Sequence, residues 1–231
     1  MKKIFFSFLF LVFAAFGFCA QTESFPSAAP QKGQASGLSV FPHSSLSVRD
    51  REIVEKALAL LNAFPPSGKK ALKDLTAEDF PSVRISMYIA PSKYLGKFLE
   101  REKNSFCKES LGKTLCVFHD GGERKEFRVL ISSDILGKGE NDAQQENGAA
   151  LAGLSAVLAR EIYGHVYWTL YEQGQNRSEK EREMYAYEQV KEFLDRVLAS
   201  DLCRSEGPAF YGCLRSEQEE AVYAWYVWSR R

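Results

Sequence analysis

Residues 149–173, AALAGLSAVLAREIYGHVYWTLYEQ, constrain the fold of this chain more than any other stretch. At about 100° per residue, one side of a helix over this stretch collects apolar positions, and Glu161 and His165 fall among them. That side comprises Leu151, Leu154, Leu158, Ile162 and Thr169. Charge on an apolar stripe is costly unless it is paired or bound. The stretch therefore predicts a buried helix with a polar site on its inner face.

A second helix is predicted from Ser178 to about Ala199, because residues 178–181 (SEKE) have the pattern of a capping box. Its inward stripe comprises Ala186, Val190, Phe193, Leu194 and Val197, and Glu183 shares that stripe. Glu161 and His165 are four residues apart, so they are neighbours on one helix face. A tight turn between the two helices would bring Glu183 opposite them.

Two readings of this trio stay open from the residues alone. Two carboxylates and an imidazole can hold a divalent ion, of which zinc is the first candidate. The same groups can instead form a satisfied buried hydrogen-bond network that needs no cofactor.

The first 20 residues have the pattern of a secretory signal peptide, an apolar run after two lysines that is too short to span a membrane. We expect removal after about Ala20, export to the periplasm or the extracellular space, and no membrane span in the mature chain. Attachment of a lipid to Cys19 is the alternative, which Phe16 and Phe18 disfavour.

Residues 21–46 are rich in Ser, Pro, Gly, Ala and Gln and show no period, which predicts a flexible linker. Residues 47–231 are then one domain with a sizeable core. Without the signal segment, 28 basic residues face 30 acidic ones. This balance predicts no broad surface for nucleic acid. The partner is unknown from the sequence, and a protein or peptide stays open.

Four cysteines remain after the signal segment, and an even number in an exported protein predicts disulfides. Of the three pairings, we expect the local one, Cys107 with Cys116 and Cys203 with Cys213. It would pin the C-terminal segment as a loop ahead of a short aromatic helix. No CxxC occurs, so a zinc knuckle is not indicated.

The remaining patterns predict an α+β fold that is predominantly helical, with a small antiparallel or mixed sheet. The expected elements are a helix over 48–63, a strand over 83–89, a helix from 93, strands over 114–119 and 126–132 joined by a hairpin, and a loop over 137–148. Asp120-Gly121-Gly122 supplies the hairpin signal.

This order of elements resembles the zincin metallopeptidases over about residues 127–198. The residues that carry the resemblance are AVLAREIYGH at 156–165 and EMYA at 183–186. In that superfamily a strand precedes a helix with HExxH, and in one branch the next helix supplies a glutamate in an ExxA-like context. The resemblance implies a zincin-like helix pair, with Glu161 as candidate base. It also implies Glu161, His165 and Glu183 as candidate metal ligands.

The HExxH signature is altered in this chain. If Glu161 matches the catalytic glutamate, Arg160 and Gly164 stand at the two histidine positions, and His165 is one residue late, about 100° around a helix. If His165 matches the second histidine, Glu161 takes the first ligand position and Ile162 replaces the base. Neither register preserves a two-histidine site with its glutamate.

Arg160 cannot donate a lone pair and would repel a metal. In the first register it could take the metal's electrostatic place by pairing with Glu161 or Glu183. The resemblance therefore implies an exported pseudoenzyme, a catalytically impaired metallopeptidase relative. The alternatives are a divergent metal-dependent peptidase that uses Glu161, His165 and Glu183, and a non-enzymatic binding or structural module of the cell envelope.

Overall fold

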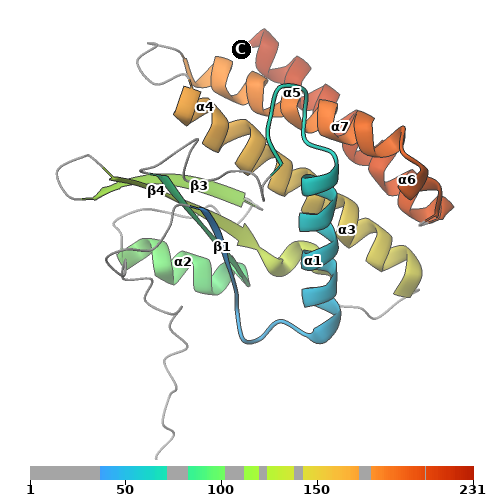
Figure 1. The fold of residues 1–231 in the computed structure, drawn as a ribbon, viewed down its shortest axis with the longest axis horizontal. Helices are drawn as coiled ribbons and strands as arrows, with labels where there is room; N and C mark the ends of the chain where they lie inside the picture. Colours follow the sequence, from blue (N-terminus) through green and yellow to red (C-terminus); the bar gives the residue numbers. More distant parts are fainter. Residues whose placement is uncertain are drawn as a thin grey trace, which may run out of the picture.

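The computed structural model describes residues 37–71, 83–101, 112–119, 124–137, 143–171, 178–205 and 207–231. These residues form a predominantly helical α+β fold built on one small sheet (Figure 1). The predicted fold class is confirmed.

The sheet is mixed and has four strands in the order β1-β2-β4-β3. They are β1 (Gly37–Pro42), β2 (Val83–Ala90), β3 (Gly112–His119) and β4 (Arg124–Ser132). The pairs β1–β2 and β2–β4 are parallel, whereas β3 pairs antiparallel with β4 as the predicted hairpin requires. The turn residues 120–123 lie outside the described residues.

Both faces of the sheet are covered. Along β2, Ile85, Met87 and Ile89 enter the main core, and the alternate residue Tyr88 packs with Leu95 of α2 (Ser92–Arg101) on the other face. This alternation follows from the two-residue period of a strand. The strand predicted over 83–89 is therefore buried on both faces, one of them by α2.

The main core lies between the sheet and a set of longer helices. These are α1 (Val48–Ala63), α3 (Ala143–Ala159), α5 (Glu179–Leu198) and α7 (Pro208–Arg230). Helix α1 begins at a capping box of Ser47 and Asp50, and α5 begins at the predicted one of Ser178 and Glu181. Helix α3 packs against α1 and α7, and α5 packs against α7 (Figure 1).

The long helix predicted over 149–173 differs in two ways. Helix α3 already begins at Ala143, after the 3₁₀-helix η3 (Ser133–Leu136), so the predicted loop over 137–148 is partly helical. After α3 the chain forms a π-helix, η4 (Arg160–Val166), before it returns to α-helix in α4 (Tyr167–Tyr171).

The linker predicted over 21–46 ends earlier than expected, because residues 37–42 form β1. His43, which the linker reading leaves in solvent, is only 6% exposed and stacks on Tyr94 at 4.4 Å between ring centroids. Strand β1 has only six residues and is surrounded by serine, proline and glycine, so its strand pattern is not distinct in the sequence. Residues 1–36, which include the predicted signal segment, lie outside the described residues.

The predicted C-terminal disulfide loop is helical instead. Cys203 lies in α6 (Asp201–Ser205) and Cys213 lies within the 23-residue α7, and both thiols are free. The expected bond between them is therefore absent from this structure, in which the segment predicted as a disulfide loop is helical. The other expected pair is not described, since Cys107 and the side chain of Cys116 lie outside the described residues.

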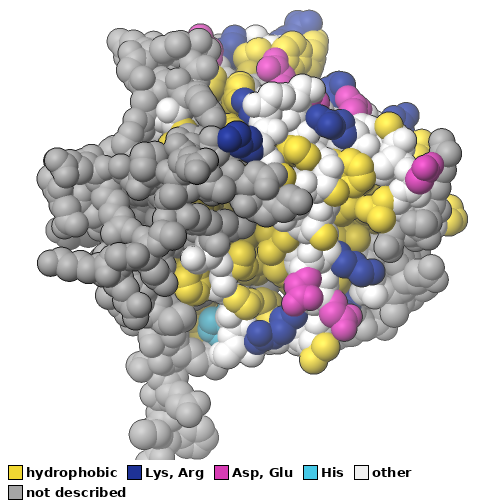
Figure 2. Space-filling model, in the orientation of Figure 1, with side chains coloured by type: hydrophobic (Ala, Val, Ile, Leu, Met, Phe, Trp, Pro, Cys, Tyr) yellow, Lys and Arg dark blue, Asp and Glu magenta, His cyan; other side chains and the backbone are white. Residues whose placement is uncertain are grey.

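The described surface shows no gathering of one charge on the face seen in Figure 2, where basic and acidic side chains are interspersed among hydrophobic ones. Within the described part of the chain, every helix is too short or too polar to cross a bilayer.

Candidate functional site

The π-helix η4 sets the orientation of the predicted site residues. The Tyr167 amide donates to the carbonyl of Ile162, five residues earlier. In such an i→i+5 pattern, residues five apart lie above one another, as residues four apart do in an α-helix. Arg160 and His165, which are five residues apart, therefore share a face. The wider turn compensates for the position of His165, one residue later than the second histidine of HExxH. Short π-helices of this kind are frequent at functional sites.

The helix that carries Glu183 lies very close to η4. A Cβ atom on Gly164 would lie 2.7 Å from Cβ and 2.8 Å from Cα of Ala186. Only glycine permits this approach, since real Cβ atoms do not come so near a backbone atom. Glu183 is one turn before Ala186 on α5, so the contact holds its carboxylate against η4.

Arg160 joins the two carboxylates of the site. Its Nη1 donates to Oε1 of Glu161 at 2.9 Å, and its Nη2 donates to Oε2 of Glu183 at 2.5 Å. The side chains of Glu161 and Glu183 are only 1% and 7% exposed, so both charges are nearly removed from water. Buried carboxylates of this kind need a cation, and a guanidinium supplies charge together with aligned donors. We call this set of three residues the arginine clamp.

His165 lies at the edge of the arginine clamp. Its Nε2 is 3.8 Å from Oε1 of Glu183, too far for a hydrogen bond but within the distance that a shared ligand site requires. Burial lowers the pKa of His165, and Arg160 also lowers it, against the opposing effect of Glu161 and Glu183. The imidazole is therefore neutral near pH 7.

In the clamp, Arg160 and the carboxylates stabilise one another's ionised forms. Burial alone would lower the pKa of the Arg160 guanidinium, but Glu161 and then Glu183 raise it above its ordinary value. Burial would raise the pKa of Glu183, but Arg160 outweighs it and holds that pKa below the ordinary value of 4.5. Both partners are ionised at neutral pH.

A metal ion does not fit the clamp as it stands. The carboxylate oxygens that would face a divalent ion accept hydrogen bonds from Arg160, and the guanidinium would repel the ion. In the described part of the chain no three His, Cys, Asp or Glu side chains form a group able to hold a metal ion.

The tyrosines beside the site have structural partners. Tyr163 donates to the carbonyl of Leu61 at 2.7 Å, and Tyr167 donates to the carbonyl of Lys70 at 3.2 Å. Both hydroxyls therefore fasten η4 and α4 to the segment that ends and follows α1. Because both hydroxyls donate to backbone carbonyls, they are not available as donors to a substrate.

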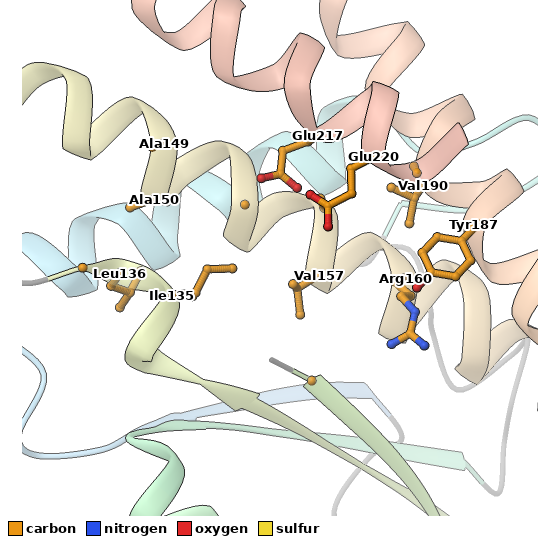
Figure 3. A pocket seen from close by; sticks show the side chains of 15 residues that line it. Ile135, Leu136, Ala149, Ala150, Val157, Arg160, Tyr187, Val190, Glu217 and Glu220 are labelled. Atoms are coloured by element: carbon orange, nitrogen blue, oxygen red, sulfur yellow. The ribbon is translucent and has the colours of Figure 1, made fainter. Parts of the chain in front are cut away.

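A pocket of about 680 Å³ opens next to the clamp. Arg160 and Tyr187 lie at one end of it and Ile135 lies toward the other, and the carboxylates of Glu217 and Glu220 point into it from α7 (Figure 3). Sequence reasoning missed these two glutamates, because it read the tail only for its aromatic residues. Their three-residue spacing, which places them on one helix face, is the signal that could have found them.

The chain was compared with protein-family models, with curated proteins and with solved structures, and nothing matched in any of the three comparisons.

Proposed function

We propose that this chain is an exported, zincin-like domain related to metallopeptidases, in which the Arg160 guanidinium takes the place of the metal. It serves as a non-catalytic binding module of the cell envelope. One observation carries the proposal: Arg160 bonds at the same time to Glu161 and Glu183, the two carboxylates that the resemblance assigns to base and ligand.

The clamp opposes hydrolysis for a simple reason. A general base must be free to take a proton from the attacking water within hydrogen-bond reach. Glu161 is 1% exposed and already accepts a hydrogen bond from Arg160, so its lone pairs and its access to water are restricted. No cation in the clamp has an open position for water.

Two further observations support the proposed ancestry. The helix pair η4 and α5 brings His165 and Glu183 within 3.8 Å of each other, as a former two-helix ligand site requires. The π-helix also accounts for the extra residue between Arg160 and His165, which would otherwise turn the imidazole away from the clamp.

The first test replaces the guanidinium of Arg160 with an imidazole, which can bind a metal ion. We expect Arg160→His to bind about one zinc ion per chain, through the introduced imidazole, His165 and Glu183, whereas the unaltered chain binds far less. Zinc content is measured by elemental analysis after dialysis with equimolar zinc. Arg160→Gln is the matched control, because it removes the same charge but supplies no imidazole, and it should stay low in zinc.

The same samples test the alternative that the chain is a divergent peptidase. The unaltered chain with added zinc should not cleave a mixed peptide substrate above the background of the Glu161→Gln variant. A full equivalent of zinc in the unaltered chain, lost in Glu183→Ala, would instead support a live site of Glu161, His165 and Glu183 and would overturn the proposal.

A further inference from the structure

Helix α3 contributes mostly small residues to the pocket that it lines together with α7. Four of the five residues of α3 that line it are small, Ala149, Ala150, Gly153 and Ala156, and the fifth is Val157. At Gly153 an added Cβ would lie 3.2 Å from Cδ1 of Ile135 and 3.4 Å from Oε1 of Glu217. The absence of a side chain at Gly153 leaves room for the carboxylate of Glu217.

Among the described residues no cation pairs with Glu217, which faces this space, and Arg160 at the end of the pocket is paired with Glu161 and Glu183. Burial raises its pKa, and the neighbouring Glu220 raises it further, with no opposing effect from a cation or a donor. In the described part of the chain neither glutamate has a hydrogen-bond donor or a cationic partner. Burial and the neighbouring carboxylate both disfavour the ionised form of Glu217, and a cation in the cavity would favour it.

The rest of the lining is apolar near the carboxylates. Ile135, Leu136 and Val157 border the same cavity, and Val190 lies beside Tyr187 (Figure 3). An apolar wall that leads to unpaired carboxylates fits a cationic group on an aliphatic stem. Two carboxylates alone are too few oxygens for a calcium site of six or more ligands.

We infer that this pocket binds a primary ammonium or guanidinium group on an apolar stem, as in a lysine or arginine side chain, with Glu217 and Glu220 as its counter-charges. The inference does not depend on the proposed function, because it uses none of the clamp carboxylates and no metal.

The test compares two peptides that differ only in the charge. The probes are acetyl-Ala-Ala-Lys-Ala-Ala-amide and the same peptide with norleucine for lysine, titrated into the full chain by calorimetry. The lysine peptide should bind at least about tenfold more tightly, since a desolvated charged pair is strong. Its affinity should fall as salt is raised.

Three variants localise the binding. Glu217→Gln should weaken the lysine peptide by about tenfold or more and leave the norleucine peptide unchanged. Glu219→Gln is the matched control, because its carboxylate is exposed on the same helix and outside this pocket, and it should bind as the unaltered chain does. Ala149→Leu, at an exposed lining position, should weaken both probes by filling the cavity.

Competition with n-pentylamine separates the two sources of the cation. Displacement of the lysine peptide by the free amine at similar concentration indicates a small-molecule ligand, and resistance to it indicates that peptide backbone contributes. Equal binding of the lysine and norleucine peptides, or equal affinities of Glu217→Gln and Glu219→Gln, would overturn the inference. Neither result would alter the zinc outcome expected for Arg160→His.

Discussion

Glu183 is the residue on which the arginine clamp depends most. It accepts the 2.5 Å hydrogen bond from Arg160 and lies 3.4 Å from Arg182. Glu183→Gln should lower the free energy of unfolding by about 1–2 kcal/mol at pH 7, a range reduced because Arg160 is partly exposed. Urea unfolding measures it. Glu179→Gln, at a 73% exposed side chain, is the control and should change stability by less than about 0.5 kcal/mol.

The same pair predicts a pH dependence. Arg160 holds the pKa of Glu183 below 4.5, so as the pH falls the unfolded chain takes up this proton before the folded chain does. The stabilisation is therefore complete above pH 4.5 and is lost as the pH falls through the lower, folded value. The difference between the unaltered chain and Glu183→Gln should shrink on going from pH 7 to about pH 3.5. A difference that grew on acidification would contradict this assignment.

At the scale of elements, the contact between η4 and α5 decides whether the clamp can form. Gly164→Ala would place a methyl group 2.7 Å from Cβ of Ala186, so α5 must shift. We expect a loss of about 1–3 kcal/mol. Gly212→Ala is the matched control on α7, where an added Cβ meets nothing within 4 Å. It should stabilise the chain by up to about 1 kcal/mol, since alanine favours helix. Equal thermal melting of the two variants would show that the close approach is unimportant.

Much of the secondary structure follows from the sequence, because its signals are local. The capping box at Ser178 and the break at Pro65 and Pro66 delimit helices without reference to the rest of the chain. The sequence also singled out Glu161, His165 and Glu183, since charge on an apolar stripe is a strong anomaly. These side chains do lie together in the structure.

The rest depends on long-range packing that no local pattern encodes. The π-helix η4 has the composition of an ordinary helix, and its wider turn goes with the close packing of Gly164 on α5. Strand β1 pairs with β2 across more than forty residues, and its own six residues look like linker. The pocket needs α7 to lie beside α3, which the expected disulfide loop would not have produced.

At the scale of the molecule, α7 belongs to the core and is not an appended tail. Phe210, Leu214 and Ala221 are buried, and the helix packs along α5 and α3. A chain ended after Cys213 should therefore lose cooperative thermal unfolding, as followed by circular dichroism, because it exposes the apolar faces of both helices. Ending the chain after Trp228 instead removes only the last turn and should preserve the transition. An unchanged transition in the shorter chain would make α7 a separable segment.

The order of the strands also determines at which margin of the sheet an attachment ahead of Gly37 would lie. The described chain begins at β1, at one margin of the sheet, and Gly112 of β3 borders the pocket at the opposite margin. An anchor or a tag joined ahead of Gly37 would therefore reach the sheet at the margin opposite the one that borders the pocket.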